Sequence, residues 1–220
     1  MKKPRPIARQ TAFSLIELLV VITIIAIIAT FSVPAVTGIL RGSSITQGSQ
    51  MLTEQFSLAR QLALSKNRSI EVRFYLYADP ESPGESIATN TTWQYHAMQL
   101  FEVLESGAAV PIDKLQRLPG IVIMSSRFTF SSLISDNGQV AKPPTSKDPE
   151  LPRGVGRNYN YISFRYLPDG STNLAPTASW FLTIHNLTDK PNGTTPPINF
   201  FTIQVDPVSG ATKGFRPTAG

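Results

Sequence analysis

An uninterrupted apolar run near the amino terminus constrains this chain more than any other feature. Residues 13–33 read FSLIELLVVITIIAIIATFSV and contain a single charged side chain, Glu17. As a helix, the run would extend about 31 Å, which is close to the thickness of the hydrocarbon core of a bilayer. The run is apolar on all sides, so a helix buried in a soluble core is disfavoured. The sequence therefore predicts a membrane-spanning segment.

The residues before the run predict its orientation. Residues 1–12 read MKKPRPIARQTA and carry four basic side chains and no acidic one. By the positive-inside rule, this flank stays in the cytoplasm and the rest of the chain lies on the far side of the membrane. The apolar core of a secretory signal peptide is roughly 7–15 residues long and is followed by a small cleavage residue. Here the run is longer and the small residue, Ala12, precedes it, although a simple signal anchor remains as an alternative.

Charge and cysteine content exclude several classes of function. The formal net charge is +5, and the first twelve residues supply four of those charges, which leaves the remainder at +1. A folded body without a basic surface argues against nucleic acid as a partner. The chain has no cysteine. Disulfides, thiolate nucleophiles and cysteine-ligated zinc are therefore excluded.

Glu17 is the unusual residue of the apolar run. A carboxylate at the centre of a membrane helix costs about 2.5–3.5 kcal/mol, and less near the end, so such a residue is expected to have a partner. Cleavage between Ala12 and Phe13 would give Phe13 a free α-amine four residues from Glu17. That amine, on the same or a neighbouring subunit, would neutralise the carboxylate. The alternative is that Glu17 is hydrated among the lipid headgroups.

Residues 11–29, TAFSLIELLVVITIIAIIA, resemble the amino-terminal signature of type IV prepilins and type II secretion pseudopilins. In that family a basic leader ending in Gly is removed, the new terminal Phe is methylated, and a Glu follows four positions later. The resemblance implies cleavage after Ala12, methylation of Phe13 and an assembly role for Glu17. The chain departs from the pattern because Ala12 replaces Gly. Pro34 falls where the family helix is kinked.

The resemblance also implies the fold class, which is α+β. A long amino-terminal helix would lie half in the membrane and half against a β-rich antiparallel head. We therefore expect a leader at 1–12, a transmembrane and assembly helix at 13–36, an amphipathic helix at 37–68 and a globular head at 69–220. Three glycines, at positions 38, 42 and 48, predict a weak stretch of helix over residues 37–48, since each costs up to ~1 kcal/mol relative to Ala.

Residues 58–75 resemble the end of the helix in H-type minor pseudopilins and FimT-like minor pilins, with Arg60, Ala63 and Asn67 at the matching positions. Asn67 is also a good residue to end a helix. The head further resembles the pilin-like D-type proteins of a verrucomicrobial gene cassette. Alternating and β-branched segments predict strands at 70–77, 93–104, 121–124, 159–167, 180–186 and 200–205. Loops are expected at 79–91, 136–158 and 188–197, and partner specificity is expected in them.

Residues able to carry out chemistry are sparse. His96 and His185 lie in separate predicted strands, and without cysteines or a nearby acidic cluster they are not expected to bind zinc. No phosphate-binding glycine loop or nucleophile elbow occurs in the chain. A calcium site built from Asp148, Glu150 or Asp206 stays open as an alternative. The sequence predicts a protein that is not an enzyme and has no cofactor or resident metal.

Two functional hypotheses follow. The first is a structural subunit, a minor pseudopilin, in a type II secretion pseudopilus or a type IV pilus-like filament. Its partners would be other pilin or pseudopilin subunits, the prepilin peptidase and the inner-membrane assembly platform. It would cross the bacterial inner membrane once, with its head in the periplasm or in an extracytoplasmic filament. The second is a signal-anchored extracytoplasmic binding module with a β-sandwich-like head, an uncleaved leader and no requirement for Glu17. The sequence leaves the filament system open.

Overall fold

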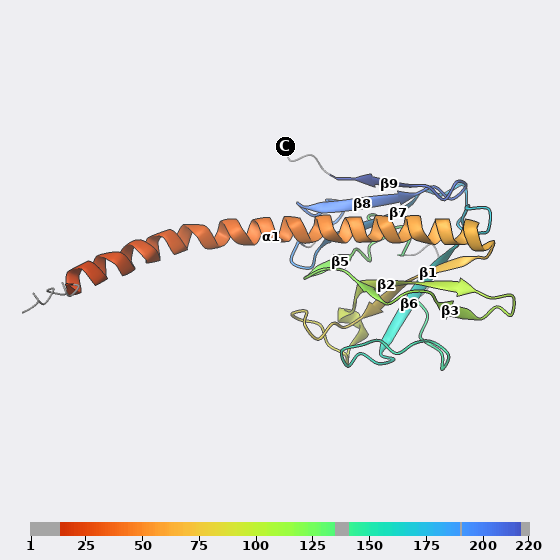
Figure 1. The fold of residues 1–220 in the computed structure, drawn as a ribbon, viewed down its shortest axis with the longest axis horizontal. Coiled ribbons are helices and arrows are strands. Elements are labelled where there is room, and N and C mark those ends of the chain that lie inside the picture. The colour runs from red at the N-terminus through yellow and green to blue at the C-terminus, as the bar shows by residue number, and fades with distance from the viewer. Residues whose placement is uncertain (1–13, 135–140, 190, 217–220) are drawn as a thin grey trace, which may run out of the picture. The chain divides into compact units, whose positions relative to one another are not determined.

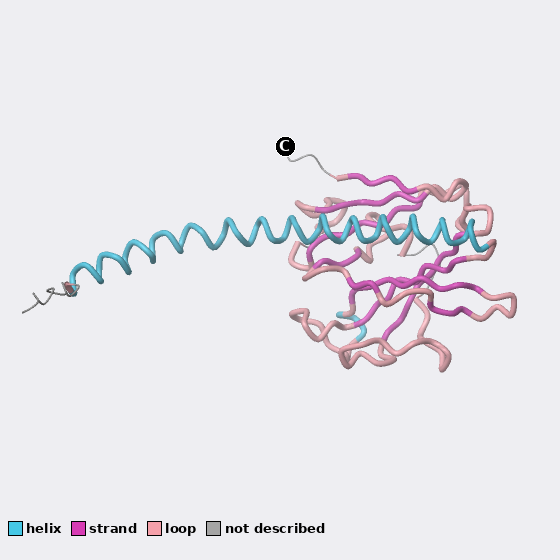
Figure 2. The backbone as a smooth tube through the Cα atoms, viewed as in Figure 1, coloured by secondary structure: helices cyan, strands magenta, loops and turns pink. Residues whose placement is uncertain are grey.

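A computed structural model describes residues 14–134, 141–189 and 191–216, without the side chains of residues 31–41. The chain divides into two compact units between Arg41 and Gly42. We call the second unit, from Gly42 onward, the head unit. One helix, α1 (Leu15–Lys66), contributes to both units (Figures 1 and 2).

The backbone of α1 is helical throughout, including Pro34 and the stretch over residues 37–48 that the glycines predict to be weak. Gly48 has a packing role instead. A Cβ placed there would lie 3.2 Å from the side chain of Leu118 and 3.4 Å from that of Ile184. Glycine therefore lets the helix approach the sheet closely at this point. Local propensity is outweighed by tertiary contact, which supplies most of the stability of a helix in a folded protein.

The carboxyl-terminal end of α1 closes at Asn67, the residue that the sequence predicts as a stop. Asn67 has a φ of 49°, which is the left-handed conformation that asparagine tolerates better than most residues. The backbone N–H of Arg68 donates to the carbonyl oxygen of Ala63 at 3.3 Å. This bond satisfies one of the last carbonyl groups of the helix and turns the chain into the first strand.

All strands of the head unit belong to one sheet with antiparallel ladders. The strand order is β6-β1-β2-β5-β7-β8-β9, and β3 and β4 also pair with β2. A short 3₁₀ helix, Asn90–Thr92, precedes β2. The bounds are β1 Ile70–Tyr77, β2 Gln94–Val103, β3 Ala109–Pro111, β4 Gln116–Arg117, β5 Val122–Met124, β6 Tyr159–Tyr166, β7 Trp180–Asn186, β8 Phe200–Val205 and β9 Thr212–Phe215.

The expected α+β class is confirmed, with a helix packed on a largely antiparallel sheet. Each of the six predicted strands is present within one residue of its expected ends. The six predicted strands do not include β3, β4 and β9, which have two to four residues and are too short to show a clear period of two.

A seam divides the sheet between β2 and β5. Only one residue pair, Tyr95 with Met124, joins these strands in register. The segment that leads into β5 pairs with β2 as far as Leu118, whose N–H donates to the carbonyl oxygen of His96. From Val122 onward the same segment pairs with β7 instead. The strands on either side of the seam therefore diverge.

The main core lies between the sheet and the part of α1 in the head unit. Phe56 of α1 packs edge-on against Phe74 of β1 and Phe164 of β6, with ring centroids 6.1 and 5.9 Å away. The other helix residues of this core recur at helical spacing and are fully buried: Ile45, Leu52, Ala59 and Ala63. The predicted amphipathic helix thus presents its apolar face to the sheet.

The opposite face of β1 is also buried, which its alternating sequence does not indicate. Residues 141–158, which we call the strap, belong to the predicted loop over 136–158. Leu151 and Val155 of the strap pack in a second apolar cluster with aromatic residues of the sheet. The alternation of β1 therefore separates two buried faces rather than a core face and a solvent face.

Candidate functional site

The first turn of α1 is closed by two hydrogen bonds, one accepted by the side chain of Ser14 and one by the side chain of Glu17. The backbone N–H of Ile16 donates to Ser14 Oγ at 3.2 Å, and the backbone N–H of Ser14 donates to Glu17 Oε2 at 2.9 Å. The arrangement resembles a capping box, in which a Ser at the helix start and a Glu three residues later satisfy otherwise unpaired backbone donors, although here the Ser14 hydroxyl accepts the N–H of Ile16. The carboxylate of Glu17 thus faces back toward the start of the helix.

Behind this cap, the large apolar side chains of α1 are exposed. Leu15 is 83% exposed, and the others are each close to half or more exposed: Ile16, Leu18, Leu19, Val20, Val21, Ile22, Ile24, Ile25, Ile27 and Ile28. A contiguous apolar surface of this kind marks a site of interaction with protein or lipid. No helix within the described residues is both long enough and apolar enough to cross a membrane.

The structure places only some of the predicted site residues. Glu17 lies in the first turn of α1, where its carboxylate has a defined partner. Ala12 and Phe13 lie outside the described residues, so cleavage and methylation stay predictions. Pro34 lies within the continuous helix, but its side chain is outside the described set, and the predicted kink stays a prediction.

Arg60, one of the residues behind the H-type resemblance, joins α1 to two turns of the sheet. Its Nε donates to the carbonyl oxygen of Ser209 at 3.0 Å and to that of Gly170 at 3.4 Å. The two turns also touch each other, because a Cβ at Gly210 would lie 2.0 Å from the carbonyl oxygen of Gly170. Arg60 therefore has a structural role that fixes the far end of α1 on the sheet.

The two histidines lie apart and make separate contacts. His96 Nε2 lies 2.9 Å from both carboxylate oxygens of Glu85, and both side chains are buried. His185 Nδ1 lies 2.8 Å from the carbonyl oxygen of Asn186. Burial lowers the pKa of His185, and the Asn186 carbonyl and Asp189 oppose that shift. Among the described residues, no three His, Asp or Glu side chains gather closely enough to hold a metal ion.

The three acids considered for calcium are not arranged as one site. Asp148 accepts hydrogen bonds from Arg73 and from Thr145. Asp206 accepts backbone N–H bonds from Val208 and Ser209, and these bonds lower its pKa. Glu150 lies beside Arg157, with a nitrogen–oxygen distance of 3.9 Å.

A buried ion cluster holds the strap on the sheet. Arg73 of β1 donates to Glu71 Oε1 at 2.6 Å and to Asp148 Oδ1 of the strap at 2.5 Å. Its guanidinium lies between the rings of Phe101 and Tyr161, at 4.1 and 4.5 Å from their centroids. Because buried charges must be paired, this arrangement specifies where the strap sits. Sequence reasoning missed the cluster, since Arg73 and Asp148 are 75 positions apart.

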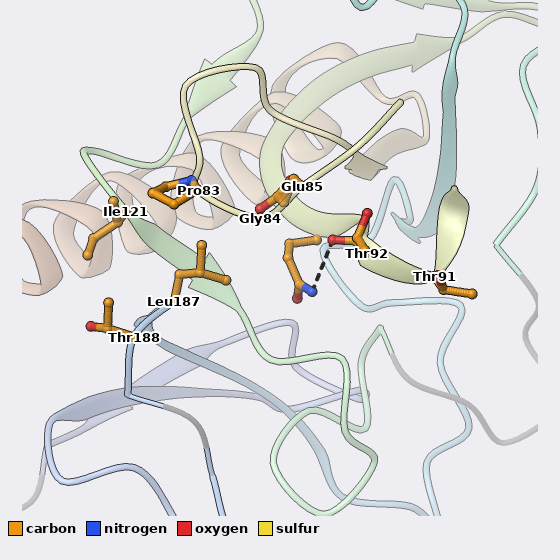
Figure 3. A pocket seen from close by; sticks show the side chains of 9 residues that line it. Pro83, Gly84, Glu85, Thr91, Thr92, Ile121, Leu187 and Thr188 are labelled. Atoms are coloured by element: carbon orange, nitrogen blue, oxygen red, sulfur yellow. Dashed lines mark hydrogen bonds between the residues drawn. The ribbon is translucent and has the colours of Figure 1, made fainter. Parts of the chain in front are cut away.

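A pocket of about 440 Å³ opens beside the seam between β2 and β5 (Figure 3). It brings together two of the loops in which partner specificity is expected. Pro83, Gly84 and Glu85 come from the first loop and Thr188 from the second, and the other lining residues are Thr91, Thr92, Gln94, Ile121 and Leu187. The apolar side chains of Pro83, Ile121 and Leu187 face the opening from different segments.

Comparison with known proteins identifies the amino-terminal motif of the chain. The family model described as the prokaryotic N-terminal methylation motif matches residues 7–33. The predicted prepilin-type motif is confirmed. No curated protein matches the chain.

Two solved structures are similar to the chain. The minor pseudopilin EpsH from the type 2 secretion system of Vibrio cholerae has 9% sequence identity and a TM-score of 0.41, over 80% of this chain and 99% of that chain. The type IV minor pilin FimU of Pseudomonas aeruginosa has 12% identity and a TM-score of 0.43, over 80% of this chain and 95% of that chain.

Proposed function

We propose that this chain is a minor pseudopilin-like structural subunit that assembles through α1 into a pseudopilus or a type IV pilus-like filament. The observation that carries the proposal is the start of α1. A methylation motif there coincides with a capped Glu17 carboxylate and with an uncovered apolar helix surface. This surface supports a structural role.

In this proposal, the apolar surface of α1 from Leu15 to Ile28 is buried in two successive environments. Before assembly it lies in the bacterial inner membrane, with residues 1–12 in the cytoplasm and the head unit in the periplasm. After assembly it packs against the same helix of other pilin or pseudopilin subunits. Both environments bury apolar side chains that are exposed in the single chain.

Glu17 sets the contact between subunits. The prepilin peptidase removes residues 1–12, which creates an α-amine on Phe13. Glu17 Oε2 accepts the backbone N–H of Ser14, so the carboxylate lies at the start of α1, beside the residue that would carry this amine. In a medium of low dielectric constant, the pairing of this amine with a neighbour's Glu17 is strong enough to fix the stagger of the helices. The inner-membrane assembly platform then extracts the subunit from the bilayer.

The decisive experiment is intact-mass and amino-terminal analysis of the full chain expressed in membranes, with and without an active prepilin peptidase. The proposal expects a product that starts at N-methylated Phe13 only when the peptidase is present. A leader that stays attached in the presence of active peptidase would favour the signal-anchored binding module. The same preparation of a Glu17→Val variant should be processed at the leader and fail to join filaments.

A further inference from the structure

Among the described residues, the large apolar side chain with the greatest exposure lies in the head unit. Ile198 is 98% exposed and belongs to the loop between β7 and β8. Pro196 and Pro197 directly precede it and restrict the backbone, and Pro197 is itself buried. Ile198 is therefore held outward on a stiff stretch of chain, so little conformational entropy would be lost if it were buried against another surface.

Ile198 lies at the end of the head unit where α1 enters it. The next residue, Asn199, has its Nδ2 atom 3.9 Å from a Cβ placed on Gly42, the first residue of the head unit. Strand β9 ends nearby, since Arg216 Nη1 donates to Oγ1 of Thr46 in α1 at 3.0 Å. In Figure 1, β8 accordingly begins and β9 ends at the same end of the sheet.

A second apolar side chain and two cations accompany Ile198. Phe215 of β9 is 43% exposed and lies opposite the beginning of β8. Lys213 Nζ lies 5.2 Å from the centroid of the Phe215 ring, and both Lys213 and Arg216 are exposed. Glu54 of α1 lines the same groove as Arg216, which leaves this end with a net positive charge. We call four of these residues the entry patch: Ile198, Lys213, Phe215 and Arg216.

The sequence of α1 indicates how far this patch lies from a bilayer. No charged residue occurs between Glu17 and Arg41. Their separation corresponds to about 36 Å along a helix, against roughly 30 Å for the hydrocarbon core, and tilt takes up the difference. If Glu17 lies at the cytoplasmic boundary of the hydrocarbon, Arg41 falls at the periplasmic boundary, and Gly42 is the next residue. A bilayer that holds this stretch therefore brings its headgroups to the residues beside Gly42.

We propose that the entry patch docks on the periplasmic surface of the bilayer before the subunit joins a filament. Ile198 and Phe215 enter the boundary between headgroups and acyl chains, and Lys213 and Arg216 contact the phosphates of anionic phospholipids. Apolar burial and attraction to anionic lipid add on such a surface. A bilayer is favoured over a partner subunit as the occupant, because α1 itself delivers it to the patch. The inference rests on the proposed function and adds to it a second membrane contact, which fixes the orientation of the head.

Fluorescence quenching by lipid tests this contact, and the lack of native cysteines allows one label at a time. The full chain with a bimane label at Ile198→Cys is reconstituted in nanodiscs of about three parts phosphatidylethanolamine to one part phosphatidylglycerol. A phospholipid with a nitroxide near its headgroup is the quencher. Val208→Cys is the matched control, because Val208 is 68% exposed but lies in the β8–β9 turn that Arg60 holds near the far end of α1. Ile22→Cys, in the apolar surface of α1, reports insertion of the helix.

We expect the nitroxide lipid to quench the labels at positions 22 and 198 roughly twofold or more, and to leave the label at position 208 unchanged. Quenching at position 198 should fall in a Lys213→Ser/Arg216→Ser variant and in nanodiscs of phosphatidylcholine alone, because the attraction to anionic lipid is lost. Quenching that survives both changes would overturn the phosphate contacts assigned to Lys213 and Arg216.

The label at position 22 separates failure of this contact from failure of the proposed function. If position 22 is quenched and positions 198 and 208 behave alike, the docking of the entry patch is overturned and the proposed function stands. A label at position 198 whose emission shifts to the blue without quenching would place a protein neighbour on the patch, which also overturns docking on lipid. A label at position 22 that is not quenched would remove the membrane step of the proposed function itself.

Discussion

The carboxylate of Glu17 accepts a hydrogen bond from the backbone N–H of Ser14 at 2.9 Å, three residues before it in the chain. The partner of this acid in the single chain is therefore the first turn of its own helix. A negative group at a helix amino terminus is stabilised by the helix dipole and by unpaired N–H groups. The capped carboxylate is thereby fixed at the end of the apolar segment, where the new terminus created by cleavage would lie.

Replacement of Glu17 by Ala should leave membrane insertion intact and impair assembly. The substitution removes an intramembrane charge, so it favours insertion, but it also removes the group that would pair with the terminal amine of a neighbour. Carbonate extraction reports insertion, and shear release of the subunit reports assembly. Glu54→Ala is the matched control, because Glu54 is an exposed acid on the same helix. Equal assembly of both variants and the wild type would contradict the role assigned to Glu17.

Replacement of Ala12 by Gly should speed removal of the leader. The family resemblance places Gly at this position, and the Cβ methyl group of Ala, which Gly lacks, would crowd a peptidase site that accepts a minimal side chain. Pulse-chase labelling with intact-mass detection measures the half-time of processing in the two chains. A matched substitution one residue earlier, Thr11→Gly, should have no comparable effect. If Ala12→Gly does not change the half-time, Ala12 is already an acceptable leader end.

Replacement of Arg73 by Leu should destabilise the head unit by about 3 kcal/mol, because it leaves the buried carboxylate of Asp148 without its cationic partner and leaves Glu71 paired with Arg165 alone. Chemical unfolding of the detergent-solubilised full chain, followed by tryptophan fluorescence, measures the change. Arg157→Leu is the control, since Arg157 lies in the exposed part of the strap with its side chain 46% exposed. Its loss should cost less than about 1 kcal/mol.

A comparison of Gly210→Ala with Gly107→Ala distinguishes the cost of backbone strain from the cost of a steric clash. Both glycines have positive φ, 67° and 79°, so an L-residue is strained at either site by roughly 1–2 kcal/mol. At Gly107 nothing lies within 4 Å of an added Cβ, whereas at Gly210 the carbonyl oxygen of Gly170 lies 2.0 Å away. We expect Gly210→Ala to destabilise the head unit by about 3 kcal/mol or more. Similar unfolding free energies for the two variants would show that the turns containing Gly170 and Gly210 can move apart without destabilising the head unit.

The unfolding free energy of the head should fall as the pH decreases below about 6.5, in part because of His185. Burial lowers the pKa of His185 in the folded protein, so the unfolded chain binds more protons in this range. Stability from this group is therefore present above the unfolded pKa and is lost as the pH falls toward the folded pKa. The slope of unfolding free energy against pH between about 7 and 5 should be smaller in His185→Gln. An unchanged slope would mean that His185 charges freely in the folded state.

Local sequence patterns determined much of the architecture. The apolar run predicts the start of α1, and Asn67 predicts its end. The alternation of residues 70–77 and the other short apolar segments locate six strands. These features depend on neighbours within a few residues, for which helical and strand periods are sufficient. The prepilin-type motif was also recognisable in the sequence, and the match to residues 7–33 confirms it.

The tertiary structure decided what covers these elements. Glu71 and Arg73 alternate with apolar residues, as they would on a solvent face, yet the strap buries them because Asp148 pairs with Arg73. Arg60 reaches Ser209 across 149 positions of sequence, and the seam pocket joins loops that are far apart in the chain. The physical reason is that such contacts depend on the order of the strands in the sheet. The local periodicity of a sequence reports only on neighbouring residues and does not reveal that order. The sequence by itself thus determined the elements and the assembly motif, and only the fold decided the strap, the docking of α1 and the pocket.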